Sequence, residues 1–270
     1  MRIGILGAKG FIGRNFKRYL LMKKIQTTTI EKFNFNIPKL KKILSGIDFL
    51  YDFSVVWQGD FIDQIINNSF CPFLIASLLT NKQKLIWVST SAIYSKSDYG
   101  ISKLIAERAL LKFKNVKILR LSNVYGSEQS VSEKTISSKV NARRIQRFVA
   151  AYKLIKENRT KWISNEKSVH GFYRRNGRII HEIKNDIIYP TYIEDVLKKL
   201  YELRLEKTKT TEFYGPKISN YALVKTIQEL LDLNIEVKYK KTRRVNTELI
   251  STPNLTDFKE GLKKWIRIES

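Results

Sequence analysis

Three glycines near the start of the chain constrain its fold more than any other feature. They lie in the segment Gly7-Ala8-Lys9-Gly10-Phe11-Ile12-Gly13, after an apolar run at residues 2–6 and before a helical pattern at 11–22. In a strand–turn–helix unit, GxxGxxG spacing uses the first glycine for a tight turn. The second lets backbone approach a pyrophosphate, and the third allows close packing of helix on strand. The segment therefore predicts a dinucleotide site at the first turn of a βαβ unit.

Strand and helix patterns alternate over the first 126 residues. We expect strands at 26–30, 33–35, 48–53, 84–89 and 116–121, and helices at 38–44, 61–79 and 99–113, the helix at 61–79 being interrupted near Pro72. This alternation predicts an α/β fold: a Rossmann-type, doubly wound parallel sheet with a smaller C-terminal substrate-binding lobe. Residues 1–126 would form the dinucleotide-binding core, completed by about 180–215, and residues 127–180 and 216–270 would form the lobe.

Beyond Gly126 the alternation is lost, and a polar, basic stretch follows. We expect a helix at 140–156 and, later, a helix at 221–231, a strand at 235–238 and a helix at 255–265. Thirteen Lys or Arg stand against two Glu between Lys134 and Arg178. This segment either binds an anionic group such as a diphosphate, with Arg143 and Arg147 as candidate contacts, or is a solvated surface.

The formal net charge of +25 would ordinarily place nucleic acid or an anionic membrane among the partners. No helix-turn-helix, zinc-finger, OB or RRM signature accompanies the charge. The abundance of Lys, Ile and Asn also resembles the codon bias of an AT-rich genome, which would put lysine on surfaces without a selected role. We therefore do not expect nucleic acid as a partner.

Cysteine and histidine are scarce. The single cysteine, Cys71, permits no intramolecular disulfide, and His170 and His181 have no ligand-spaced partner, so we expect no zinc site. No apolar run approaches the ~18 residues of a membrane span, and the chain runs from Met1 into a strand without a leader pattern. We expect a cytoplasmic protein without a membrane partner.

A phenol and an ammonium lie four residues apart in Tyr99-Gly100-Ile101-Ser102-Lys103, hence on one face of a helix. An ammonium so placed can stabilise a phenolate and hold a nicotinamide ribose. Nine residues before Tyr99, the buried strand ends in Ser89-Thr90-Ser91, at the edge where open α/β sheets bind ligands. A hydroxyl there can polarise a carbonyl or share an alcohol proton with Tyr99.

Glu31 follows the second predicted strand, 18 residues beyond Gly13. There it can accept hydrogen bonds from a ribose 2′-hydroxyl and repel a 2′-phosphate. NAD is therefore the expected cofactor, with NADP left open because Lys32 stands beside Glu31.

Together these motifs resemble the extended short-chain dehydrogenases/reductases, specifically the NAD-dependent epimerase/dehydratase family of nucleotide-sugar enzymes. The likeness covers nearly the whole chain and includes Leu119-Arg120-Leu121-Ser122-Asn123-Val124-Tyr125-Gly126, Tyr192-Ile193-Glu194-Asp195-Val196 and Phe213-Tyr214-Gly215. It implies hydride transfer at a carbon of a nucleotide-linked sugar, a role in surface polysaccharide biosynthesis, and a homodimer through the helices near Tyr99.

The resemblance also assigns residues. Thr90, Tyr99 and Lys103 would be catalytic. The substrate would meet Thr90, Ser91, Tyr99 and Asn123, together with Arg143 and Arg147. The cofactor would meet Gly7, Gly10, Phe11, Ile12, Gly13, Glu31, Asn36, Ser54, Asn68, Tyr99, Lys103 and Leu121.

The sequence departs from the family pattern in ways that bear on the reaction. The segment from Thr90 to Tyr99 is short, and no room remains for a full helix between the strands expected at 26–30 and 33–35. Both features favour a ketoreductase, whereas Glu31 suits an epimerase. Both reactions stay open. Dehydration is disfavoured because Ser91-Ala92 stand where 4,6-dehydratases carry an Asp-Glu pair. The rival hypothesis is a catalytically inactive dinucleotide-binding regulator, or a nucleic-acid-binding protein, on the same fold.

Overall fold

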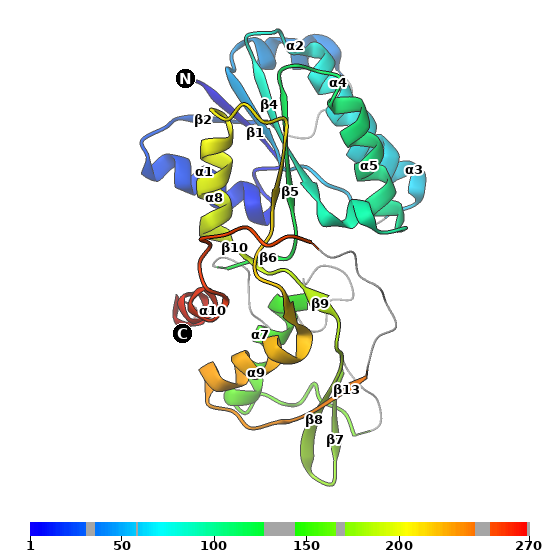
Figure 1. Cartoon of the computed structure of the whole chain (residues 1–270), viewed down its shortest axis with the longest axis vertical. Helices are drawn as coiled ribbons and strands as arrows, with labels where there is room; N and C mark the ends of the chain where they lie inside the picture. The colour runs from blue at the N-terminus through cyan, green and yellow to red at the C-terminus, as the bar shows by residue number, and fades with distance from the viewer. Residues whose placement is uncertain (31–35, 58, 127–143, 166–170, 241–248, 269–270) are drawn as a thin grey trace. The chain divides into compact units, whose positions relative to one another are not determined.

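The computed structural model describes residues 1–270 except 31–35, 58, 127–143, 166–170, 241–248 and 269–270. The chain divides into two compact units. The first comprises Met1–Ser122 and Ile193–Phe213, and the second comprises Asn123–Tyr192 and Tyr214–Ser270 (Figure 1).

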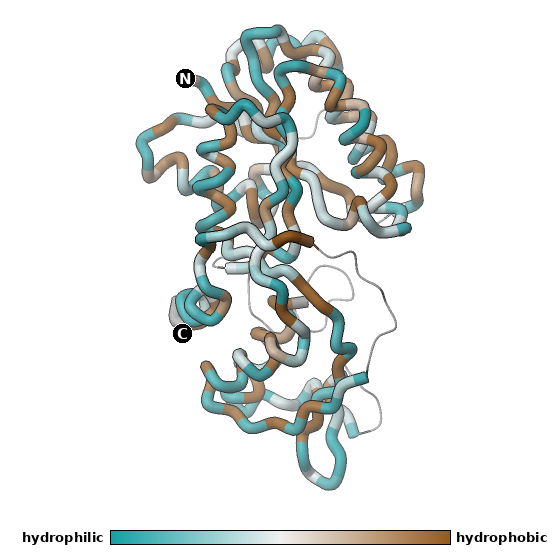
Figure 2. Tube along the Cα trace, in the orientation of Figure 1, coloured by the Kyte–Doolittle hydropathy of each residue, from teal (hydrophilic) through white to brown (hydrophobic). Residues whose placement is uncertain are grey.

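The described residues of the first unit form a six-stranded sheet in the order β11-β5-β4-β3-β1-β2. All neighbouring strands pair in parallel. The central strands of this sheet are rich in hydrophobic residues, whereas the two edge strands are mostly polar (Figure 2). The strands are β1 (Ile3–Leu6), β2 (Thr27–Ile30), β3 (Phe49–Asp52), β4 (Lys84–Thr90), β5 (Val116–Leu121) and β11 (Thr210–Phe213). The predicted fold class is confirmed.

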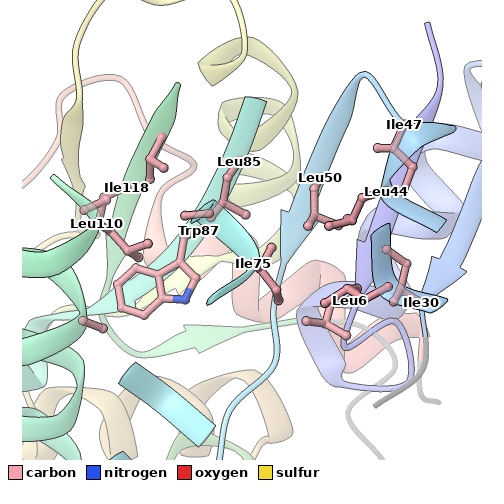
Figure 3. Packing of buried hydrophobic residues seen from close by; sticks show 14 residues of the cluster. Leu6, Ile30, Leu44, Ile47, Leu50, Ile75, Leu85, Trp87, Leu110 and Ile118 are labelled. Carbon is pink, nitrogen blue, oxygen red and sulfur yellow. The ribbon is translucent and has the colours of Figure 1, made fainter. Parts of the chain in front are cut away.

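Helices cover both faces of this sheet (Figure 1). On one face, strand residues such as Leu50, Leu85 and Trp87 pack with residues of α2, α4 and α5 in one buried cluster (Figure 3). On the other, the Phe16 ring of α1 lies 4.5 Å from that of Tyr51. The helices are α1 (Phe11–Met22), α2 (Ile37–Ser45), α3 (Phe61–Ile65), a π-helix (Ile66–Phe70), α4 (Cys71–Leu78), a 3₁₀ helix (Ser91–Tyr94), α5 (Asp98–Leu110) and α8 (Ile193–Leu203).

The helix expected at 38–44 is present as α2, which connects β2 to β3. These strands pair with opposite sides of β1, and parallel strands need a crossover connection, usually helical. Asn36 begins the helix: its side-chain oxygen accepts a hydrogen bond from the Lys39 amide at 3.0 Å. The strand expected at 33–35 lies outside the described residues.

The second unit combines helices with a three-stranded sheet in the order β13-β8-β7. Sequence patterns did not predict the β7–β8 hairpin, whose turn at Asn176-Gly177 has positive φ at both residues. The elements are β6 (Val124–Tyr125), α7 (Arg144–Lys156), β7 (Phe172–Arg175), β8 (Arg178–Lys184), β9 (Ile187–Ile188), β10 (Thr191–Tyr192), β12 (Ile218–Ser219), α9 (Asn220–Leu231), β13 (Glu236–Lys240) and α10 (Phe258–Ile268).

Candidate functional site

The glycine turn after β1 packs directly on the chain that leaves β3. Gly7 has φ +77°, and a Cβ on it would lie 2.7 Å from the Phe53 carbonyl carbon and 2.8 Å from the Ser54 nitrogen. A Cβ on Gly13 would lie 2.3 Å from the Gly7 oxygen, so α1 also touches the turn. A side chain at either glycine would therefore push the turn away from the backbone segment that it contacts.

The turn lies where the strand order reverses. Because β2 and β3 flank β1 on opposite sides, the carboxyl ends of β1 and β3 form the switch point at which open α/β sheets bind ligands. Gly10, the N-cap of α1, carries no side chain over the first turn of the helix. The positive end of the α1 dipole can therefore face an anion, which fits the diphosphate of a dinucleotide.

Asp52 is the last residue of β3 and is fully buried. Its Oδ1 accepts hydrogen bonds from the Ser54 amide at 2.8 Å and the Ser54 hydroxyl at 2.5 Å. Oδ2 has no hydrogen-bond partner among the described residues. Burial raises the pKa of the carboxyl group, while the bonds from Ser54 and the charge of Lys103 oppose that rise. Sequence analysis missed Asp52, because a carboxylate after an apolar run looks like any exposed strand end.

Thr90 ends β4, and its hydroxyl oxygen accepts a hydrogen bond from the Ala92 amide at 3.1 Å. That bond turns the chain into the 3₁₀ helix and leaves the hydroxyl proton available for donation. Ser89 before it is buried, and Ser91 after it is half-buried. Gly100 lets α5 approach this turn, because a Cβ there would lie 2.1 Å from the Ala92 oxygen.

Tyr99 lies in the first turn of α5, which Ser97 caps by accepting a hydrogen bond from the Gly100 amide at 3.1 Å. The half-buried Tyr99 ring stacks on Trp57, with ring centroids 5.1 Å apart and an interplanar angle of 11°. Trp57 follows β3 and was not a predicted site residue. A single aromatic residue in a loop belongs to no sequence motif, so its contact with Tyr99 could not be predicted.

Lys103 is 2% exposed and lies between α5 and β4. Its Nζ donates a hydrogen bond to the Val88 oxygen at 2.7 Å and sits 3.6 Å from the centroid of the Trp87 ring. Burial lowers the pKa of Lys103 to about 7, and the negative charges of Asp52 and then Glu107 oppose that fall. Lys103 is thus close to a change of charge near neutral pH.

Asn68 holds the chain after β3 against the start of α5. Its Oδ1 accepts a hydrogen bond from the Val56 amide at 2.9 Å, and its Nδ2 donates to the Val56 oxygen at 2.8 Å and to the Ser102 hydroxyl at 3.1 Å. Ser102 in turn donates to the Tyr99 carbonyl oxygen at 2.9 Å. This chain of bonds fixes the two segments that carry Trp57 and Tyr99.

The remaining predicted site residues are distributed over the chain. Leu121 is buried at the end of β5, where it pairs with Thr90, and Phe11 and Ile12 are half-buried at the start of α1. Asn36 is exposed, with its side chain engaged as the cap of α2. Asn123 and Arg147 belong to the second unit. Glu31 and Arg143 lie outside the described residues.

An ionic network around the buried Glu107 ties α5 to the sheet. Arg120 of β5 donates to Glu107, with an Nη2 to Oε2 distance of 2.6 Å, and to Glu212 of β11 at 2.8 Å. Tyr94 also bonds to Glu212. This network fixes the helix that carries Tyr99 and Lys103.

In the part of the chain that the structure describes, no group of three or more His, Cys, Asp or Glu could hold a metal ion. No helix among the same residues combines the length and apolar character needed to cross a membrane.

The fold and the strand-end site together define a Rossmann-type α/β protein with a glycine turn at the switch point of its parallel sheet. No protein-family model and no curated protein sequence matches the chain. Solved structures do match over its whole length, and several of them are nucleotide-sugar enzymes.

Three of these structures illustrate the likeness. The dTDP-4-dehydrorhamnose reductase of Bacillus anthracis, in complex with NADP, is 17% identical with a TM-score of 0.74, covering 100% of this chain and 98% of that one. The UDP-glucose 4-epimerase of Thermotoga maritima, with UDP-glucose, is 16% identical with a TM-score of 0.73, covering 99% and 98%. The dTDP-glucose 4,6-dehydratase of Bacillus anthracis, in complex with NAD, is 17% identical with a TM-score of 0.72, covering 99% and 96%. The resemblance stated from sequence is therefore confirmed at the level of the fold.

Proposed function

We propose that this chain is an NAD(P)-dependent oxidoreductase or epimerase acting on a nucleotide-linked sugar. One observation carries the proposal: a single edge of one parallel sheet holds the glycine turn after β1, Thr90 at the end of β4, and the start of α5 with Tyr99. The structural neighbours that bind NAD, NADP or UDP-glucose support the same class.

Each residue has a role in this proposal. Gly7 and Gly10, with the N-terminus of α1, would hold the cofactor diphosphate. A bound nicotinamide would supply the hydride acceptor and donor. The phenol oxygen of Tyr99 would take the proton of a sugar hydroxyl or return it, and the Thr90 hydroxyl would donate to the same oxygen. Lys103 would favour the phenolate by its charge.

Tyr99→Phe tests this function, with Tyr94→Phe as the matched control. Tyr94 is an exposed tyrosine five residues earlier that bonds to Glu212. Purified protein would be incubated with UDP-, GDP-, CDP- and dTDP-linked sugars and either nicotinamide cofactor. We expect Tyr99→Phe to lower turnover by about 10²–10⁴-fold, the usual worth of a general acid–base group, and Tyr94→Phe to keep it. No turnover of any sugar, or equal loss in both variants, would contradict the proposal.

The reaction and the cofactor form are finer parts of the proposal. Glu31 favours NAD over NADP, because its carboxylate would accept hydrogen bonds from a ribose 2′-hydroxyl and repel a 2′-phosphate. An epimerase must retain its cofactor between oxidation and reduction, whereas a reductase exchanges it at each turnover. NAD released on denaturing the purified protein would therefore favour the epimerase.

We further propose that the chain forms a homodimer through α3 to α5 in the cytoplasm, acting in surface polysaccharide biosynthesis. Large apolar side chains on these elements are exposed, and such surfaces support a partner: Phe61, Ile62, Ile66, Phe70, Phe73, Ile101 and Ile105. Ile105→Glu should convert a dimer to a monomer in light scattering, whereas Leu205→Glu, at an exposed leucine after α8, should not.

The net charge of +25 favours a second candidate, a nucleic-acid-binding protein that has lost catalysis. It would bind DNA or RNA with a steep salt dependence, and its behaviour would not change in Tyr99→Phe.

A further inference from the structure

Asp52 is a buried carboxylate that the proposed reaction does not use. It lies at the carboxyl end of β3, in register with Leu6 of β1 and Trp87 of β4. Among the residues that the structure describes, Ser54 bonds to Oδ1 and no group bonds to Oδ2. A carboxylate buried in this way is costly unless an opposite charge compensates it.

The compensating charge within reach is Lys103. Side chains alternate along a strand, so Leu50 and Asp52 share the face of β3 that packs against α4 and α5. Trp87, the strand partner of Asp52, belongs to the same face. Because the Lys103 ammonium sits 3.6 Å from the Trp87 ring, it lies in the same layer as the carboxylate.

We propose that Asp52 is a positioning residue for Lys103. Its carboxylate, fixed by Ser54 at the end of β3, keeps the Lys103 ammonium charged and seated between α5 and β4. The pair thereby sets the pH range in which the neighbouring Tyr99 can exchange a proton. The last step depends on the proposed function, whereas the electrostatic coupling does not.

Other charged groups contribute less to this site. Glu107 lies one turn further along α5 and also favours the charged form of Lys103, after Asp52. Its carboxylate is already bound by Arg120 of β5 through three hydrogen bonds. Asp52 is therefore the carboxylate whose removal should change Lys103 most.

Trp87 provides a readout that needs no cofactor and no substrate. It is 1% exposed, and the ammonium lies over its ring, so loss of the Lys103 charge should change its fluorescence. We expect a titration in the wild-type protein with a midpoint near the Lys103 pKa of about 7. Trp87→Phe should remove the signal, and Lys103→Met should remove the titration.

The decisive variant is Asp52→Asn, which keeps the shape of the side chain and removes its charge. We expect the midpoint to fall by about one pH unit or more, the usual effect of removing an opposite charge at close range. Asp48→Asn is the matched control. Asp48 precedes the same strand at its other end, pairs with Arg2 at the surface, and should leave the midpoint unchanged.

If Asp52→Asn does not fold, Ser54→Ala provides the test of the proposal. It removes the hydroxyl bond to Oδ1, weakens the ionised form of Asp52, and should lower the midpoint in the same direction. In a Lys103→Met background, Asp52→Asn should cause no further pH-dependent change in fluorescence. An unchanged midpoint in a folded Asp52→Asn protein, or in Ser54→Ala when Asp52→Asn fails to fold, would overturn the proposal.

Activity measurements separate this proposal from the proposed function. With turnover, the alkaline limb of the pH profile should move to lower pH in Asp52→Asn, together with the fluorescence midpoint. A shifted midpoint in a protein without turnover would support the coupling and contradict the enzyme. Turnover that depends on Tyr99, with an unshifted fluorescence midpoint, would support the enzyme and contradict the coupling between Asp52 and Lys103.

Discussion

Two neighbouring glycines should respond differently to the same methyl group, because one is needed for folding and the other for binding. A Cβ on Gly13 would lie 2.3 Å from the Gly7 carbonyl oxygen, a backbone atom that cannot rotate away. A Cβ on Gly10 would lie 3.3 Å from the same oxygen, a tight contact that a small shift relieves. Gly13→Ala should therefore destabilise the apo protein more than Gly10→Ala does.

The magnitudes follow from the two environments. Overpacking costs about 1–3 kcal/mol, against a gain of about 1 kcal/mol for alanine over glycine within a helix. Because the clash on Gly13 is with backbone atoms, its cost should lie at the upper end of that range, so Gly13→Ala should lose about 2 kcal/mol, which lowers Tm by about 2–4 °C per kcal/mol in a domain of this size. Gly10→Ala loses about 0.5–1 kcal/mol, because alanine is a poorer N-cap than glycine. Gly46→Ala is the control, since the nearest atom to its Cβ would be 3.6 Å away.

Thermal melts with and without NAD or NADP are the assay. A cofactor at about 100 times its Kd adds about 2.7 kcal/mol of stability, and a tenfold loss of affinity removes about half of that. We expect Gly10→Ala to keep most of the apo Tm and lose most of the cofactor-induced rise, since its methyl lies where the diphosphate would approach. A full cofactor-induced rise in Gly10→Ala would refute the assignment of the turn, and a wild-type Tm in Gly13→Ala would refute the packing argument.

Three further predictions concern buried groups of the first unit. Glu107→Gln should lower the free energy of unfolding by about 3 kcal/mol in denaturant titrations, because Arg120 loses its buried partner; a loss below ~1 kcal/mol would contradict this. The Lys103 pKa of about 7 lies below the unfolded value, so wild-type stability gains as pH rises from about 7 toward 10. Relative to wild type, Lys103→Met should therefore lose stability as pH rises from about 7 toward 10, because it lacks this gain; a constant difference would argue against burial of the charge. Gly100→Ala should lower Tm, because its Cβ would lie 2.1 Å from the preceding turn, and an unchanged melt would exclude that contact.

Much of the first unit could be predicted because its signals are local. Strands β1, β3, β4 and β5 are buried on both faces, so each appears in the sequence as an apolar run. The turn at Gly7 requires positive φ, a conformation that glycine adopts readily, so the glycine itself indicates the turn. Hydroxyls and a phenol at the ends of these runs could then be assigned to one edge of the sheet.

The parts that could not be predicted depend on contacts between distant segments. The segment at about 180–215 was expected to complete the core, but the strand β11 and its pairing with β5 were not predicted, because no local pattern encodes that pairing. The helical stretch at 61–79 changes to a π-helix at Ile66–Phe70, where Asn68 turns inward to bind Val56 and Ser102. Asp52 could not be predicted as a site residue, because its burial depends on β4 and α5, which lie further along the chain.

The short segment between Thr90 and Tyr99 bears on how such a site tolerates shortening. In a parallel sheet, the helix that follows a strand starts near the carboxyl end of that strand. The chain between β4 and α5 therefore needs only to reverse direction. The Thr90 hydroxyl begins that turn, and Gly100 lets α5 start against it. The chain that leaves β4 thus returns to the same edge within nine residues. The number of residues between the two hydroxyl groups is therefore a weak guide to the reaction.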